Sequence, residues 1–164
     1  MKVSKTNAMR LLDAAGILYE THSYRTDDGA LDGVSVARKT GRDPAQVFKT
    51  LVAQDTLSGL LVFCIPVAQE LNLKQAAHTA EKKSISMLPQ ARLLSETGYI
   101  HGGVSPVGMK RLLPTFLCAA ARQQNSILVS GGKVGLQIEL SPKDLLAICR
   151  AQWMEMPPAT EPSF

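Results

Sequence analysis

Two adjacent apolar runs constrain the fold more strongly than any other feature of the sequence. Residues 47–54, VFKTLVAQ, and residues 59–67, GLLVFCIPV, are both rich in β-branched side chains, and the residues DTLS separate them. Apolar runs of this length that are bounded by turn-forming residues are typical of β-strands. The two runs therefore predict a β-hairpin.

Further helices and strands are expected on both sides of this hairpin. Helical periodicity and capping residues predict helices over residues 5–15, 34–41, 43–46, 72–80, 88–97 and 142–150. We expect Ser4 to cap the first helix and Ser141 the last. Other strands are predicted at residues 17–24, 115–119, 126–130 and 135–140. Because some strands adjoin and others are separated by helices, we expect one α+β, or mixed α/β, domain with strands in both directions.

Length and composition are those of a globular protein. The chain has 164 residues, of which 45% are apolar and 20% charged, and no apolar run is long enough to cross a bilayer. Charges near the amino terminus argue against a signal peptide. Cys64, Cys118 and Cys149 are far apart and form no CxxC or Cys/His cluster. We therefore expect no disulfide and no structural zinc, and a reduced, cytoplasmic location.

The net charge of +4 permits a polyanionic partner without requiring one. Aromatic residues make up only 5% of the chain, which argues against a surface that stacks many bases. Charge alone therefore leaves nucleic-acid binding open.

Lys49 is the most informative single residue. Strand alternation places Lys49 on the same face as Val47 and Leu51, where an unpaired charge would be unfavourable. Either its aliphatic stem reaches the sheet edge, or its ammonium group points into a polar pocket with an anionic partner. The pattern by itself leaves both interpretations open.

Two glycine clusters bear on the same question. They are GYIHGGVSPVG, residues 98–108, and SGGKVG, residues 130–135. Free backbone amides in such clusters can form a concave site for an oxyanion or phosphate, although a tight turn explains either cluster alone. Neither cluster is a P-loop or a dinucleotide-binding fingerprint. Two clusters together with an inward-facing lysine favour a binding cleft.

The usual catalytic motifs are absent from the sequence. There is no nucleophile elbow, no HExxH and no suggestively spaced carboxylate pair. We expect His22 and His78 to face solvent, whereas His101 is a candidate site residue because it adjoins two glycines. Cys64 is expected to pack in the core. If the chain is an enzyme, it therefore works by binding and orienting a reactive substrate.

Three motifs in this order resemble one family. VFKTLV, GYIHGGVSPVG and VSGGKVGLQIEL are similar to the YbaK/EbsC family of free-standing aminoacyl-tRNA deacylases, which are related to the editing domain of bacterial prolyl-tRNA synthetases. The resemblance covers residues 4–150 and is greatest to the Cys-tRNA(Pro) deacylases, which implies a trans-editing enzyme that removes cysteine from Cys-tRNA(Pro), with Cys-tRNA(Cys) as a further candidate substrate. It implies one domain over residues 1–155 with a curved or barrel-like mixed sheet surrounded by helices. Residues 156–164 are then expected to form a disordered tail.

The resemblance also implies a function and a site. Mischarged tRNA would be bound at its aminoacylated 3′ end, and in the Cys-specific branch the substrate's own thiol would attack the ester and leave as a cyclic thiolactone. Lys49 matches the family's essential lysine and would hold the terminal adenosine or the ester oxygen. The resemblance further implies that the substrate is bound by Tyr24, Thr50, His101, Gly102, Gly103, Ser105, Ser130, Gly132 and Gln137.

Two residues depart from the family pattern. His101 stands where relatives carry an aliphatic residue, and Gln137 stands where the Cys-specific enzyme has an acidic one. A neutral amide would weaken a contact with the substrate's ammonium group, so two alternatives stay open. One is water-mediated deacylation of another small amino acid, and the other is a non-catalytic module that binds tRNA ends or a synthetase. We expect tRNA and prolyl-tRNA synthetase as partners, and no metal, organic cofactor, DNA or membrane.

Overall fold

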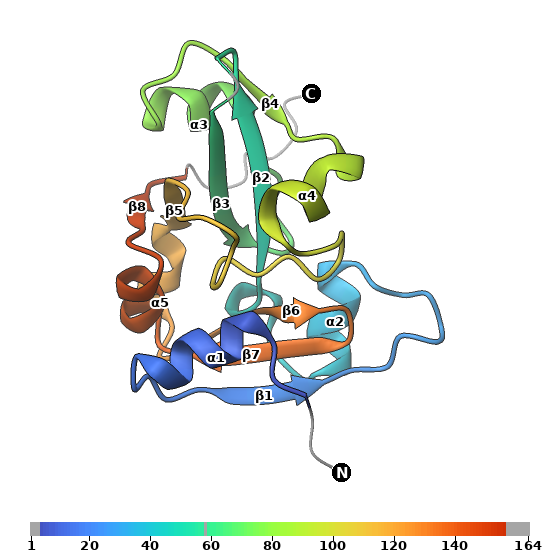
Figure 1. Ribbon diagram of the computed structural model, residues 1–164. Helices are drawn as coiled ribbons and strands as arrows, with labels where there is room; N and C mark the ends of the chain where they lie inside the picture. Colours follow the sequence, from blue (N-terminus) through green and yellow to red (C-terminus); the bar gives the residue numbers. More distant parts are fainter. Residues whose placement is uncertain (1–3, 58, 157–164) are drawn as a thin grey trace, which may run out of the picture.

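The computed structural model describes residues 4–57 and 59–156, and its strands form two β-sheets (Figure 1). The smaller sheet is antiparallel, with the order β1 (Glu20–Ser23), β7 (Leu136–Leu140) and β6 (Ile127–Lys133). The larger sheet has the order β4 (Ile85–Met87), β2 (Phe48–Asp55), β3 (Leu60–Pro66), β5 (Thr115–Cys118) and β8 (Gln152–Met154). The helices are α1 (Asn7–Ala14), α2 (Gly33–Lys39), α3 (Leu73–Thr79), α4 (Leu93–Thr97) and α5 (Pro142–Ile148), with 3-10 turns η1 (Pro44–Gln46), η2 (Gln90–Arg92) and η3 (Ala119–Gln123).

The hairpin predicted from the two apolar runs is confirmed as β2 and β3. These strands pair antiparallel from Phe48 opposite Pro66 to Gln54 opposite Leu60. Every residue of β3 is buried, because β3 lies inside the larger sheet with β2 on one side and β5 on the other. β5 runs parallel to β3 and β8 runs parallel to β5, so the predicted mixture of strand directions is also confirmed.

Within residues 4–57 and 59–156, one isolated backbone bridge joins the two sheets. Val47, just before β2, pairs in parallel with Leu128 of β6. Ala37 of α2 and Val67 pack around this bridge as a small buried cluster. The strands predicted to form one curved sheet are thus divided in two, because among the described residues β6 is bridged only to Val47, just before β2, and pairs with no residue of β2 itself.

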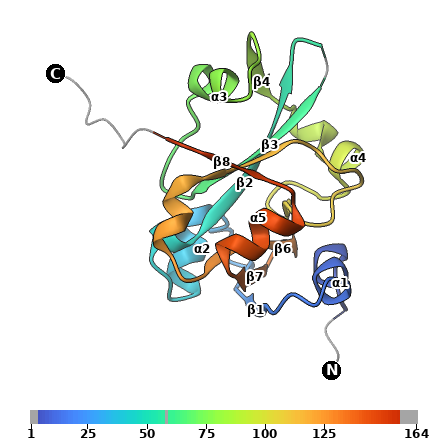
Figure 2. The same ribbon diagram turned by 90° about the vertical axis from the view of Figure 1, so that its left-hand side faces the viewer.

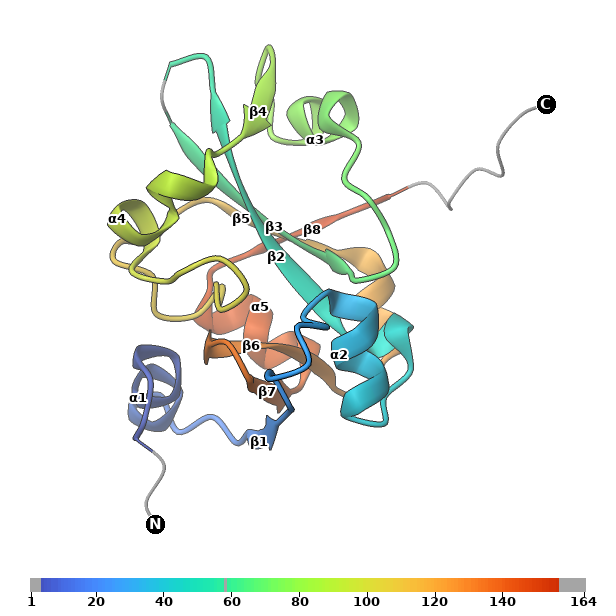
Figure 3. The same ribbon diagram turned by 90° about the vertical axis from the view of Figure 1, so that its right-hand side faces the viewer.

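Helices pack around both sheets, and two of them flank the smaller sheet. α1 and α2 lie at opposite ends of that sheet in Figure 3, and α1 buries Ala8, Met9 and Leu12. In Figure 2, α5 lies between β8 and the smaller sheet. α4 and the glycine-rich segment that follows it lie beside β2 (Figures 1 and 3). These elements leave the middle of β2 next to the glycine-rich segment.

Several predicted boundaries need correction. The N-cap of α1 is Thr6 and not Ser4, because the Thr6 hydroxyl accepts a hydrogen bond from the Met9 amide at 3.3 Å. The helix predicted over residues 88–97 consists of η2 followed by α4. The short strands β4 and β8 were not predicted. Of the predicted tail, residues 157–164 lie outside the described part of the chain.

No helix within the described residues combines the length and the hydropathy that a membrane span requires.

Candidate functional site

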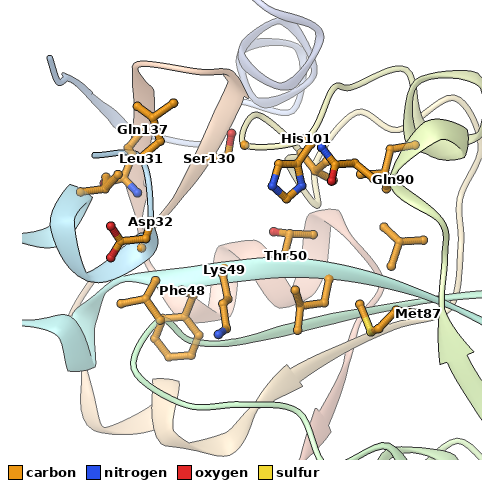
Figure 4. Close-up of a pocket in the computed structure, with 18 of the residues that line it drawn as sticks. Leu31, Asp32, Phe48, Lys49, Thr50, Met87, Gln90, His101, Ser130 and Gln137 are labelled. Carbon is orange, nitrogen blue, oxygen red and sulfur yellow. The ribbon is translucent and has the colours of Figure 1, made fainter. Parts of the chain in front are cut away.

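A cavity of about 410 Å³ lies along the middle of β2. Its wall is formed by the start of α2, by the segment from β4 to α4, by the glycine-rich segment and by the smaller sheet. Cavities of this size are common for small-ligand sites. Figure 4 shows the side chains that line it.

Five consecutive residues of β2, from Phe48 to Val52, line this one cavity. Side chains alternate between the two faces of a strand, so consecutive residues can share a cavity only where it reaches the strand's edge. β4 pairs with β2 only at Ala53 to Asp55, and the bridge to β6 lies at Val47. The cavity therefore occupies an unpaired stretch of the β2 edge.

Most of the predicted site residues lie together in this cavity. They are Tyr24, Lys49, Thr50, His101, Gly102, Ser130 and Gln137. In Figure 4, Thr50 rises from β2 toward Ser130 and His101, whereas Lys49 leaves the strand in the opposite direction. The alternation predicted for Lys49 and Thr50 is therefore confirmed.

Lys49 is half-buried at the cavity. Burial lowers the pKa of its ammonium group from the ordinary value of 10.5, while the negative charge of Glu70 acts in the opposite direction. A partly desolvated cation interacts more strongly with an oxygen anion than a cation in bulk water does.

Gln137 brings an unusual polar group to the cavity. It stands opposite Ser130 in the β6–β7 ladder and is only 6% exposed. Its side-chain carbonyl oxygen, Oε1, is the only buried side-chain nitrogen or oxygen atom in the described residues without a hydrogen-bond partner. Buried polar groups are nearly always hydrogen-bonded, so an unpaired one beside a cavity suggests a ligand that supplies the partner.

Three predicted site residues do not line the cavity. A Cβ atom on Gly103 would lie 2.9 Å from the backbone of Lys133, so this glycine permits a close approach between two chain segments. Ser105 is fully buried, and its hydroxyl accepts a hydrogen bond from the Val107 amide. Gly132 lies against the ring of Tyr99. The contacts of these three residues are within the protein.

The residues that α2 and β4 contribute to the cavity were not among the predicted site residues. Asp32, Gly33 and Val36 come from the start of α2, and Met87 from β4. Residues 25–33 are mostly polar and contain two glycines, which is typical of a loop. Asp32, close before the helix predicted from residue 34, is nevertheless a favoured N-cap residue. The Asp32 carboxylate does accept a hydrogen bond from the Ser35 amide at 3.1 Å.

None of the three cysteines provides a nucleophile. Cys64, Cys118 and Cys149 are all buried, as expected of core residues. Burial raises the pKa of the Cys64 thiol to about 12, so the reactive thiolate is essentially absent at neutral pH.

One cluster outside the cavity resembles a metal site in composition. Glu20, His22 and Glu139 bring potential ligand atoms within 4.8 Å of one another. The Glu139 carboxylate already accepts a hydrogen bond from the guanidinium group of Arg42 at 2.8 Å and another from the Ser126 hydroxyl. A cation would be repelled by Arg42, so we assign no metal to this cluster.

Comparisons with known proteins identify similar sequences. The sequence profile of the family described as "Aminoacyl-tRNA editing domain" matches residues 30–148. EbsC of Enterococcus faecalis (strain ATCC 700802 / V583), assigned as a Cys-tRNA(Pro)/Cys-tRNA(Cys) deacylase, is 40% identical over 152 residues, which are 93% of each chain.

Two solved structures share the fold at low sequence identity. One, of a protein assigned as a trans-editing enzyme for prolyl-tRNA synthetase, has a TM-score of 0.82 and 21% identity, covering 91% of this chain and 93% of that chain. The other, of the hypothetical protein APE2540, has a TM-score of 0.83 and 20% identity, covering 92% of this chain and 98% of that chain. At these identities the likeness concerns the fold alone.

Proposed function

The chain belongs to the aminoacyl-tRNA editing domain family, and on that basis we propose that it is a free-standing deacylase that removes cysteine from mischarged Cys-tRNA(Pro). The activity assigned to EbsC, which aligns along nearly the whole of both chains, supports this substrate. The bond to be broken is the ester between the amino acid and the terminal ribose of the tRNA.

The observation that carries this proposal is a cavity in which no described hydrogen bond joins a base to a hydroxyl or thiol and so activates a protein nucleophile. Cys64 is buried with a pKa of about 12, and the hydroxyl of Ser130 accepts a hydrogen bond from the Gly132 amide. His101, the only histidine that lines the cavity, belongs to no described hydrogen bond with a hydroxyl or thiol. A substrate that carries its own nucleophile suits such a site, because the protein then needs only to orient it.

Cysteine esterified to tRNA carries a nucleophile of this kind. Its sulfur attacks the ester carbonyl carbon, a C–S bond forms, and the C–O bond to the ribose breaks. The proton lost by the thiol ends on the ribose oxygen. The products are a cyclic thiolactone of cysteine and a tRNA with a free 3′ end.

Lys49 is our candidate for the essential cation. We place its ammonium group at the terminal adenosine or at the ester oxygen, where a partly desolvated charge favours negative charge that develops in the reaction. In Figure 4 the side chain points away from Thr50, but a lysine stem has four flexible carbons with which to turn toward bound substrate.

Gln137 supports a second candidate substrate class. Its amide is neutral and therefore attracts the ammonium group of an aminoacyl ester less strongly than a carboxylate would. Weaker attraction at this position is compatible with water-mediated deacylation of another small amino acid, such as alanine. The same residue would then bind the substrate without selecting cysteine.

We propose that a partner protein selects the tRNA. The cavity is large enough for an aminoacyl group but offers no surface that would read an anticodon, which lies far from the 3′ end of tRNA. We propose that prolyl-tRNA synthetase supplies this selectivity in the cytoplasm.

The proposal is tested by charging tRNA(Pro) separately with cysteine, alanine and proline and following release of each amino acid. We expect rapid loss of cysteine alone, and a decrease of at least about 100-fold in the Lys49→Ala variant, as is usual when a group that stabilises developing charge is removed. Lys74→Ala, which removes an exposed lysine of α3, is the matched control and should match the wild type.

Each outcome of this panel has a distinct meaning. Loss of alanine in place of cysteine would favour the water-mediated reaction. Full activity of Lys49→Ala would overturn the role of Lys49, and release of none of the three amino acids would overturn the assigned substrates.

A further inference from the structure

The two edges of β2 differ in their hydrogen bonding. On the β3 side, the Val67 amide donates to the Val47 carbonyl at 2.9 Å, and the Asp55 amide donates to the Gly59 carbonyl at 2.9 Å. Val47, the residue just before β2, and Asp55, the last residue of β2, are both odd-numbered. On the opposite edge the Leu88 amide donates to the carbonyl of the even-numbered Val52 at 2.9 Å.

These bonds fix the direction of the Thr50 main chain. Backbone N–H and C=O groups alternate between the two edges along a strand, so the groups of Thr50 point to the same edge as those of Val52. On that edge β4 pairs only with Ala53 to Asp55, and the bridge to β6 lies at Val47. No described strand pairs with Thr50 there, and its N–H and C=O face the cavity.

An unpaired edge of this kind is a template for one more residue of β-structure. An aminoacyl ester carries an ammonium donor and a carbonyl acceptor on either side of one α-carbon, as a residue in a strand does. In a hydrogen-bonded antiparallel pair, two opposite residues exchange both of their N–H···O bonds. The aminoacyl group of a charged tRNA therefore has the chemistry to pair with a single residue on an open edge.

We propose that the main chain of Thr50 binds the aminoacyl group of the substrate as a one-residue extension of the larger sheet. The Thr50 N–H donates to the ester carbonyl oxygen, and the substrate's ammonium group donates to the Thr50 carbonyl. The inference rests on the proposed function and deepens it by naming the group that recognises the α-amino ester.

Two consequences follow for the reaction. The Thr50 N–H stabilises the negative charge that the ester oxygen acquires when the carbonyl carbon is attacked, which is the role of an oxyanion-hole donor. Side chains of directly opposite residues lie on the same face of a sheet. The substrate's side chain accordingly points to the face of Thr50, toward Ser130 and His101 (Figure 4).

The first test compares Thr50→Pro with Thr50→Val. Proline removes the N–H, and because the N–H of residue 50 belongs to no ladder bond with β3, the sheet should tolerate it. Valine removes the side-chain hydroxyl and keeps the N–H. We expect kcat of Thr50→Pro to be about 100-fold below that of Thr50→Val, as is typical for loss of one oxyanion donor. Equal kcat values for the two variants would overturn the proposal.

Proline also restricts the backbone angle φ, so a second test removes the N–H without introducing a proline ring. Replacing Thr50 with its α-hydroxy analogue exchanges the main-chain N–H for an oxygen atom and leaves the side chain unchanged. The matched control is the same exchange at Ala53, an odd-numbered residue whose N–H bonds to β3 and which lies outside the cavity wall. We expect the exchange at Thr50 to lower kcat about 100-fold at unchanged Tm, and the exchange at Ala53 to lower Tm at unchanged kcat.

Both tests use whichever aminoacyl-tRNA of the panel the wild type hydrolyses fastest. If the assigned substrate is wrong, the wild type will hydrolyse an ester other than Cys-tRNA(Pro) fastest. If the Thr50 proposal is wrong, the exchange at Thr50 will leave kcat on that fastest ester at the wild-type value. If the exchange at Thr50 lowers Tm and leaves kcat unchanged, the Thr50 N–H is a structural group and the proposal is wrong.

Discussion

Gln137 and Glu139 are two residues apart on β7 and lie on the same face of the smaller sheet, yet their surroundings are opposite. The carboxylate of Glu139 is contacted by His22 at 2.8 Å, by Arg42 at 2.8 Å and by the Ser126 hydroxyl. The side-chain oxygen of Gln137 has no partner. Both side chains are nearly buried, so exposure does not explain the difference.

From this difference we infer that Glu139 stabilises the fold, and we propose that Gln137 binds a ligand. The partners of Glu139 come from β1, from the segment after α2 and from the residue before β6, so its carboxylate joins three separate parts of the chain. Gln137 opens on the cavity instead. A satisfied polar network holds structure together, whereas an orphaned group beside a cavity lowers stability until a ligand arrives.

The largest effect that this comparison predicts is on stability, at Glu139. Replacing Glu139 with leucine removes the acceptor from Arg42 and His22, which remain partly exposed and can regain some water. We expect the free energy of unfolding to fall by about 2–3 kcal/mol, within the range for hydrogen bonds to charged groups. Urea denaturation measures this loss, and kcat per folded molecule should stay at the wild-type value.

Glu20→Gln is the matched control for this substitution. Glu20 is the other carboxylate near His22, but its side chain is 76% exposed and its oxygen lies 4.0 Å away. Such an exposed pair contributes under about 1 kcal/mol. If Glu20→Gln and Glu139→Leu lost equal free energies of unfolding, the Glu139 network would stabilise the fold no more than an exposed ion pair does.

The second prediction is an opposite pattern at Gln137. Gln137→Leu removes a buried oxygen that has no partner, so stability should stay the same or rise by about 1 kcal/mol. Activity should fall about 10- to 100-fold in kcat/KM, because the substrate loses one hydrogen bond. Deacylation kinetics and urea denaturation of the same variant separate the two effects. A destabilised Gln137→Leu variant with normal activity would contradict the proposed role.

Local signals in the sequence predicted much of this architecture and of the cavity. The hairpin of β2 and β3 follows from apolar runs and turn residues, and the opposite directions of Lys49 and Thr50 follow from strand alternation. The family resemblance drawn from three motifs is confirmed. Most of the residues that it pointed to line the cavity, although their roles remain predictions.

Features that depend on distant pairing were not predictable in the same way. The open edge of β2 exists because β4 ends at Met87 and because Val47 meets Leu128, which lies 81 positions further along the chain. Strands of three residues, such as β4, carry too little periodicity to be recognised alone. Gly103 is a further example, because the sequence alone does not distinguish a glycine that packs against another backbone segment, here that of Lys133, from one that contacts a ligand.

The smallest predicted effect is a difference in pH dependence between the two positions. Burial alone would raise the pKa of Glu139, but hydrogen bonds from Ser126 and His22 and the charge of Arg42 outweigh burial and hold it below the ordinary value of 4.5. A carboxyl group whose pKa is lower in the folded state stabilises the fold above its unfolded pKa, and this stabilisation is lost as the pH falls through the folded pKa. The wild type should therefore lose stability below about pH 4.5 partly through Glu139.

Glu139→Gln isolates this contribution, because glutamine keeps the shape and does not titrate. The wild type should be the more stable protein at pH 7, and its advantage over Glu139→Gln should shrink as the pH falls below 4.5. Other carboxyl groups with lowered pKa values, such as Asp55, are present in both proteins and cancel in the difference. The stability difference between wild type and Gln137→Leu should not change with pH, since neither side chain titrates. If the difference in the free energy of unfolding between wild type and Glu139→Gln stayed constant from pH 7 to pH 3, the carboxylate charge would contribute nothing to stability. The contribution of Glu139 would then come only from packing and uncharged hydrogen bonds.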